Sequence, residues 1–139
     1  MKIKTEWLSF DTKGRDDVID ITGRVAEVIE SAKIAEGNVT IFVHGSTASV
    51  TTLEYEPGLV ADIKALGENI ASAKRSYAHD ETWGDANGYS HLRASTIGPS
   101  LTIPIEGGKM TLGTWQQIVV IDHDNRPRDR KVVVQAIGK

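Results

Sequence analysis

The final third of the chain holds three short runs of β-branched and apolar residues, and these runs are separated by brief polar turns. The runs are Leu101–Ile105, Thr114–Asp122 and Lys131–Ile137, and the turn Glu106–Lys109 has the Gly-Gly centre of a hairpin. Strands joined by short turns pair antiparallel, because a parallel pair needs a crossover of a dozen or more residues. The pattern therefore predicts an antiparallel sheet.

The first half of the chain adds further strands and two helices. Ile3–Phe10, Val39–Val43 and Val50–Tyr55 have strand character. A first helix is expected between Thr22 and Gly37, and a second over Leu59–Ile70, where apolar residues recur every three or four positions. No repeat or linker divides the chain. We expect a single α+β domain over residues 1–139, with mostly antiparallel sheet packed with two helices.

Composition excludes several classes of protein. The net charge of -3 makes nucleic acid a poor partner. The chain has no cysteine, so a metal must be held by His, Asp or Glu. The N-terminus lacks the apolar core of a signal peptide, and no apolar run is long enough to cross a membrane. A cytoplasmic location without membrane contact is the resulting expectation.

The segment Tyr77–His91 is polar and has no periodicity, so it is predicted to be a long loop. It concentrates His79 and His91 with Asp85 and Asn87. Two imidazoles and a carboxylate can bind zinc or a similar ion. The alternative is a solvated loop whose histidines cap turns, because this histidine spacing matches no strong metal motif.

The segment that follows the predicted strand Val39–Val43 is the second candidate site. Gly45 allows a backbone N–H to approach a ligand closely, and Ser46 and Thr47 offer hydroxyl groups to a phosphate oxygen. The alternative is a tight turn in which Ser46 and Thr47 satisfy their own backbone. A serine hydrolase is disfavoured, because the chain has no G-x-S-x-G motif.

Two further features lie nearer the C-terminus. Trp115 could stack on a flat ring whose edge Gln116 would contact, or Trp115 could be an ordinary core residue. Arg126, Arg128 and Arg130 could form a phosphate-binding patch. Alternatively they belong to a solvated hairpin, whose charge neighbouring aspartates offset.

Together these segments resemble the YjbQ family, which is described as secondary thiamine-phosphate synthases. The motifs that carry the resemblance are His44 with Ser46-Thr47-Ala48, Glu54, Asp62, Tyr77-x-His79, Asp85-x-Asn87-x-x-x-His91, Gly98 with Ser100, Ile103-Pro104-Ile105, Gly108, Leu112-Gly113-Thr114-Trp115-Gln116, and the final hairpin ending in Gly138. They occur in family order from about Val39 to Gly138. Many members have H-T-S-A or H-T-T-A where this chain has H-G-S-T-A, and the additional residue changes the geometry near His44.

The resemblance implies a homotrimer with pockets near subunit interfaces and a weak thiamine-phosphate synthase activity. That reaction joins a pyrimidine pyrophosphate to a thiazole phosphate, so the partner would be a phosphorylated small molecule. The implied roles are a divalent metal, zinc or magnesium, on His79 and His91; catalysis by Asp85 and Glu54, with Asn87 orienting Asp85; and substrate binding by His44, Ser46, Thr47, Trp115 and Gln116. A non-catalytic trimer that binds a metal or small ligand is the rival, and a purely structural trimer is a third reading.

Overall fold

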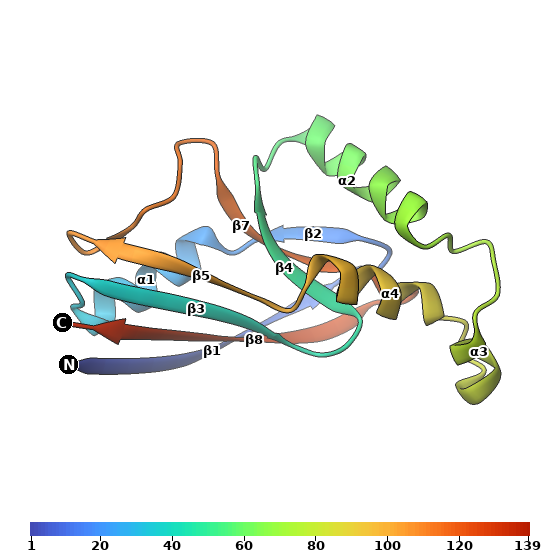
Figure 1. Ribbon diagram of the computed structural model, residues 1–139, viewed down its shortest axis with the longest axis horizontal. Coiled ribbons are helices and arrows are strands. Elements are labelled where there is room, and N and C mark those ends of the chain that lie inside the picture. The colour runs from blue at the N-terminus through green and yellow to red at the C-terminus, as the bar shows by residue number, and fades with distance from the viewer.

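Every strand pair in the computed structural model, which describes residues 1–139, is antiparallel. The strands are β1 (Lys2–Thr12), β2 (Asp17–Asp20), β3 (Gly37–His44), β4 (Ala48–Leu53), β5 (Ser100–Glu106), β6 (Lys109–Met110), β7 (Gln117–Asp122) and β8 (Arg128–Gly138); the helices are α1 (Thr22–Ala32), α2 (Pro57–Ile70), α3 (Ala78–Trp83) and α4 (Gly88–Ile97). The α+β prediction is confirmed (Figure 1). No helix is long and apolar enough to cross a membrane.

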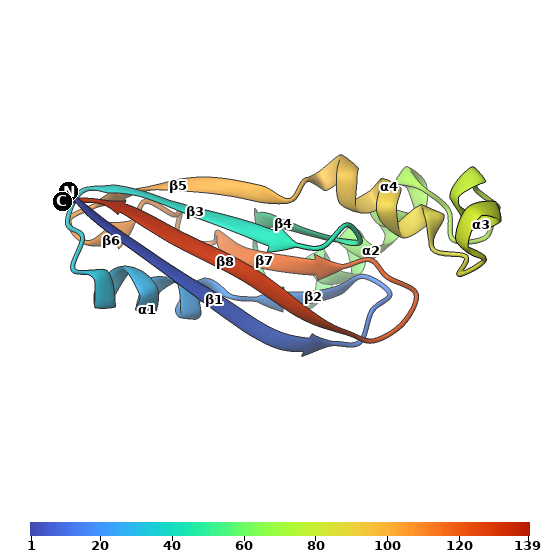
Figure 2. The same ribbon diagram turned by 90° about the horizontal axis from the view of Figure 1, so that it is seen from below.

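The strands form two sheets, with the orders β1-β8-β3-β5-β6 and β2-β7-β4. The longest pairing joins the two ends of the chain, from Lys2 opposite Gly138 to Thr12 opposite Arg128. Figure 2 shows the two termini side by side at one end of an elongated molecule. The opposite end carries α3 and α4, so polar segments far apart in the sequence meet there.

The hydrophobic core lies between the two sheets and is completed by α1. On β3, Val39, Ile41 and Val43 are buried, whereas the residues between them are exposed. Val25 and Ile29 of α1 pack into the same cluster. Alternating burial on β3 is what the strand period of two requires when one face meets the core.

The other face of the five-stranded sheet is uncovered. Trp7, Val133 and Phe42 form one row across β1, β8 and β3. Trp7 is 54% exposed and Phe42 is 43% exposed. Figure 1 views this face, with α1 behind the sheet. Two large apolar side chains are thus exposed to solvent on this sheet face.

The prediction that Tyr77–His91 is a long loop is wrong, because α3 and the start of α4 lie there. The side chain of Asp80 accepts a hydrogen bond from the Tyr77 N–H and begins α3, and Gly84 in the left-handed region ends it. None of the residues of α3 is buried, and α4 buries Ser90 and Arg93 among its contacts. Neither helix therefore shows the apolar period that reveals a helix in a sequence.

Candidate functional site

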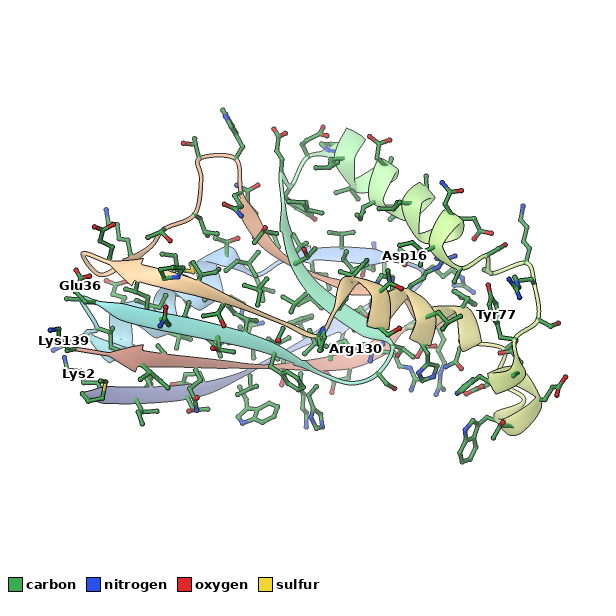
Figure 3. All side chains as sticks on the ribbon, viewed as in Figure 1. Lys2, Asp16, Glu36, Tyr77, Arg130 and Lys139 are labelled. Carbon is green, nitrogen blue, oxygen red and sulfur yellow. The ribbon has the colours of Figure 1, made fainter.

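A pocket of about 350 Å³ lies at the end of the molecule that carries α3 and α4. Its lining residues are Gly45, Ser46, Thr47, His79, Trp83, Asp85, Asn87, His91, Arg128 and Arg130. They come from the β3–β4 turn, from the segment that contains α3 and the start of α4, and from the beginning of β8. Arg130 is labelled in Figure 3. The structure thus brings together the two polar segments and, of the arginine-bearing segment, Arg128 and Arg130 but not Arg126. That segment is not a hairpin, because β7 and β8 lie in different sheets.

The β3–β4 turn contributes to this pocket three residues whose backbone N–H groups have no acceptor. The N–H groups of Gly45, Ser46 and Thr47 donate to no acceptor within the chain. Gly45 has φ +147°, which few side chains permit, and a Cβ there would stand 2.9 Å from Nη1 of Arg130. Successive free N–H groups beside a guanidinium form a concavity that suits an anion.

Replacing Gly45 by alanine is expected to destabilise the protein by about 1–3 kcal/mol, because the new methyl group adds backbone strain and displaces Arg130. Denaturant unfolding measures the change. Gly107→Ala is the matched control, since Gly107 also has a positive φ but has nothing within 4 Å of the added Cβ. A Gly45→Ala loss no larger than that of Gly107→Ala would show that Arg130 does not press on this position.

Buried carboxylates hold the two arginines of the pocket. Nε and Nη2 of Arg130 donate to Asp122 at 2.8 and 2.7 Å, and Nε of Arg128 donates to Asp124 at 2.9 Å. Asp122 and Asp124 are fully buried. Burial alone would raise the pKa of Asp122, but hydrogen bonds from Arg130 and Thr12 outweigh it and hold that pKa below its ordinary value. Burial would likewise raise the pKa of Asp124, but hydrogen bonds from Thr47 and the Asn125 N–H outweigh it and lower that pKa, so both carboxylates are ionised acceptors at neutral pH.

Thr47 is not free to bind a ligand through its hydroxyl. Its Oγ1 donates to Asp124 at 2.9 Å and accepts from Nη2 of Arg130 at 2.6 Å. The hydroxyl has one proton, which Asp124 receives. The structure thus gives the Thr47 side chain the task of holding Arg130, and Thr47 can offer a ligand its backbone N–H. The Ser46 side chain is exposed and makes no hydrogen bond.

His79 and His91 stand side by side, with ring centroids 4.3 Å apart and planes tilted by 47°. Nδ1 of His79 is buried and has no hydrogen-bond partner. Burial and the neighbouring His79 lower the pKa of His91, whereas Asp124 and Asp85 act in the opposite direction. No group of three or more His, Asp or Glu side chains converges as metal ligands. The two imidazoles thus supply at most part of a coordination sphere.

Acidification is expected to destabilise the protein through His91. Its folded pKa lies below the ordinary value of 6.5, so the unfolded chain takes up this proton at a higher pH. The contribution of neutral His91 to the free energy of unfolding is fully present above pH 6.5. It is lost as pH falls through the folded pKa. Thermal unfolding at pH 7.5 and pH 5 should show a larger decrease in Tm for the wild type than for His91→Gln. Equal decreases would contradict this account.

Four predicted site residues lie outside the pocket. Glu54, Trp115 and Gln116 cluster beyond the far end of β4, where Gln116 donates to the Thr52 hydroxyl. Trp115 is 73% exposed, so the core alternative for it is wrong. His44 lies on the uncovered sheet face, edge-on to Trp7 with ring centroids 5.6 Å apart. Within one chain, these four residues contribute nothing to the pocket.

Sequence reasoning missed a buried network behind the pocket. His123 contacts Asp16 through Nδ1 and Ser49 through Nε2, the latter at 2.8 Å. Arg93 completes the network by pairing with Asp16. The Ser-His-Asp order is that of a hydrolase triad, but Ser49 is fully buried and meets no substrate. Asp16 and Ser49 lie 107 and 74 residues from His123, so no local motif could reveal these contacts.

The chain is similar to known proteins over nearly its whole length. The model of the YjbQ family, UPF0047 protein YjbQ-like, matches residues 6–139. A UPF0047 protein of Methanothermobacter thermautotrophicus is 38% identical over 139 residues, which is 100% of this chain and 95% of that protein. A solved hypothetical protein from Aeropyrum pernix K1 has a TM-score of 0.91 at 32% identity, covering 98% of this chain and 99% of that chain. A YbjQ-like protein of unknown function from Sulfolobus solfataricus P2 has a TM-score of 0.89 at 29% identity, covering 99% of each chain.

Proposed function

We propose that this chain, which belongs to the YjbQ-like UPF0047 family, binds a phosphorylated small molecule in the pocket between the β3–β4 turn and α4. One observation carries the proposal: three successive pocket residues have backbone N–H groups without an acceptor, and Nη1 of Arg130, which makes no hydrogen bond, stands next to the first of them, Gly45. Because Asp122 and Thr47 fix the guanidinium, these donors need little rearrangement to receive phosphate oxygens.

The reaction that suits this site is the thiamine-phosphate synthase type. The C–O bond between the pyrimidine methylene carbon and the pyrophosphate breaks, and pyrophosphate leaves with the electron pair. The ring nitrogen of the thiazole phosphate then supplies the pair that forms the new C–N bond. No net proton transfer is required. Arg128, Arg130 and the N–H groups of the turn would stabilise the leaving pyrophosphate, and the carboxylate of Asp85 would stabilise the cationic side of the transition state.

A divalent ion fits the pocket in part. His79 and His91 would hold it, and the unpartnered Nδ1 of His79 is suited to such a bond. Two imidazoles favour zinc over magnesium, which prefers oxygen ligands. When bound, the ion would neutralise charge on phosphate oxygens. Metal analysis of the purified protein beside His79→Ala/His91→Ala tests this: about one zinc per chain, lost in the variant, supports the site, and no zinc in the wild type removes the metal from the proposal.

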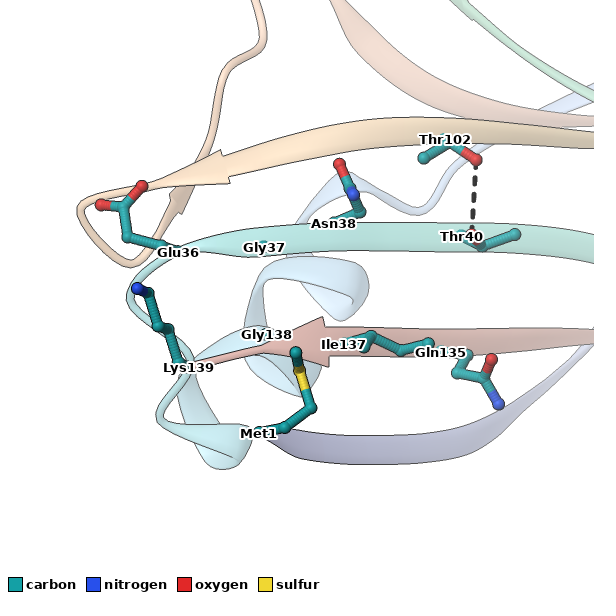
Figure 4. Close-up of a pocket in the computed structure, with 10 residues that line it drawn as sticks. All are labelled: Met1, Glu36, Gly37, Asn38, Thr40, Thr102, Gln135, Ile137, Gly138 and Lys139. Atoms are coloured by element: carbon teal, nitrogen blue, oxygen red, sulfur yellow. Dashed lines mark hydrogen bonds between the residues drawn. The ribbon is translucent and has the colours of Figure 1, made fainter.

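We further propose that the chain forms a homotrimer through the uncovered sheet face. A hollow of about 610 Å³ lies on this face. Figure 4 shows uncharged side chains such as Thr40, Thr102 and Gln135 along it, with the charged Glu36 and Lys139 at the end of the strands. Thr40 and Thr102 contact each other at 3.3 Å. The row of Trp7, Val133 and Phe42 adjoins this hollow. An apolar and uncharged centre is typical of contacts between identical subunits.

The Trp7→Glu variant is expected to be monomeric, because a carboxylate at the centre of an apolar interface cannot be buried unpaired. Light scattering coupled to gel filtration measures the mass. Leu66→Glu is the control, since Leu66 is 47% exposed on α2, away from the sheet face, and the trimer should persist. A monomeric wild type, or a trimeric Trp7→Glu, would contradict the proposed interface.

The catalytic proposal is tested by incubating the protein with the pyrimidine pyrophosphate and the thiazole phosphate and measuring thiamine phosphate by chromatography. We expect product above the rate without protein, reduced about a hundredfold in Arg130→Lys, which loses the fixed fork. Leu92→Ala, on the exposed side of α4, is the control. Tight binding of pyrophosphate without product would instead identify a non-catalytic binding protein.

A further inference from the structure

Asp124 accepts hydrogen bonds from several side chains of the pocket, although it is buried behind them and cannot contact a ligand. Its Oδ2 accepts from Thr47 Oγ1 and from Nε and Nη2 of Arg128, each at 2.9 Å. Its Oδ1 accepts from Nδ2 of Asn87 at 3.4 Å and from the Asn125 N–H at 2.8 Å. Asp124 is fully buried. It therefore acts on the pocket through the three lining residues that hydrogen-bond to it, and Nη2 of Arg130 lies farther away, 3.9 Å from its Oδ2.

Only a carboxylate satisfies this arrangement. Every neighbour of Asp124 at its two side-chain oxygens is a donor, and an ionised carboxylate is an acceptor on both sides. An amide in its place would turn an NH₂ group toward the donors on one side. The carboxylate also determines how Asn87 is turned: its NH₂ faces Asp124, and its Oδ1 remains buried without a partner. Asn87 consequently has an acceptor oxygen that no group of the chain uses.

We infer that Asp124 is the positioning residue of the pocket, which sets the direction of Arg128 and the orientation of the Asn87 amide for a phosphorylated ligand. This inference rests on the proposed function, because it concerns the same pocket. On this inference, the affinity for phosphate depends on the side-chain orientations that Asp124 imposes as well as on the positive charge of the arginines.

The test compares Asp124→Asn with the wild type, using pyrophosphate as the probe in titration calorimetry. We expect affinity to fall about tenfold or more, because the lining donors lose their orientation. In ¹H–¹⁵N spectra the Nε–H signal of Arg128 should move to the position of a free arginine, whereas that of Arg130 stays. Ser90→Ala is the control: Ser90 is fully buried and donates to the His123 carbonyl, so its loss should lower Tm and leave affinity within about twofold.

If Asp124→Asn does not fold, Arg128→Lys provides the test, since it keeps the charge but cannot pair with Asp124 through Nε. An affinity about fivefold weaker at unchanged Tm would support the inference. Wild-type affinity in a folded Asp124→Asn, or in Arg128→Lys, would overturn it while the phosphate site stands. A wild type that does not bind pyrophosphate would remove the proposed function, and this inference with it.

Discussion

Replacing Arg130 by alanine should destabilise the protein by about 3–5 kcal/mol and abolish pyrophosphate binding. The guanidinium makes two hydrogen bonds to Asp122, whose side chain is fully buried. Removing it leaves a buried carboxylate with only the Thr12 hydroxyl and the Asp124 N–H as donors. Such a charge must be protonated or exposed for the chain to remain folded.

Urea unfolding measures this loss, and the matched control is Arg128→Ala. The Arg128 side chain is 32% exposed, so water can partly solvate the carboxylate that it leaves. We expect its cost in stability to be clearly smaller than that of Arg130→Ala. Equal losses, or a loss below about 1 kcal/mol for Arg130→Ala, would show that the Arg130–Asp122 pair does not support the fold.

Replacing Asp16 by alanine is the second change with a large expected effect, about 3 kcal/mol or more. Asp16 joins Arg93 to His123, and all three side chains are buried. Without the carboxylate, Arg93 retains Glu68 at 2.8 Å, and His123 loses its partner at Nδ1. The network connects the β1–β2 turn, α4 and the end of β7, so its loss should loosen all three.

Asp16→Asn separates charge from shape in this network. Asp16 has φ +62°, and asparagine tolerates that left-handed conformation, whereas alanine does not. We expect Asp16→Asn to be less destabilising than Asp16→Ala. Glu6→Gln, which removes an exposed pair with Lys4, should change the unfolding free energy by less than about 0.5 kcal/mol. A similarly small effect of Asp16→Ala would contradict the proposed role of the network.

Strand positions could be predicted because their physics is local. Apolar, β-branched runs bounded by polar turns marked β3, β5 and β8, and the mostly antiparallel sheet is confirmed. The expected pairing of the three C-terminal runs with one another is wrong, because β7 pairs with β2 and β4, whereas β8 pairs with β1 and β3 in the other sheet. The short connection between β7 and β8 therefore crosses from one sheet to the other. The short helix α3 could not be predicted, since it buries no side chain and depends on a cap at Tyr77. The hydrophobic periodicity that identifies a helix in a sequence arises from its buried face. A helix that buries no side chain therefore has no such periodicity.

The pocket could be predicted only as separate pieces. The polar character of Ser46, His79 and Arg130 was visible, but their convergence depends on long-range pairing. The burial of Asp122 and Asp124 could not be inferred, because alternating acidic and basic residues are equally typical of a solvent-exposed loop. The separation of Trp115 from the pocket likewise follows from the length of β4 and from no property of the tryptophan itself.

Titration of ¹⁵N-labelled protein with pyrophosphate tests the central claim most directly. Pyrophosphate carries the phosphate oxygens that the pocket should receive, and each donor has its own signal. The account predicts saturable shifts of the Gly45, Ser46 and Thr47 amides, together with the Nε–H signals of Arg128 and Arg130. No saturable shift in these signals, or shifts confined to another part of the surface, would contradict it.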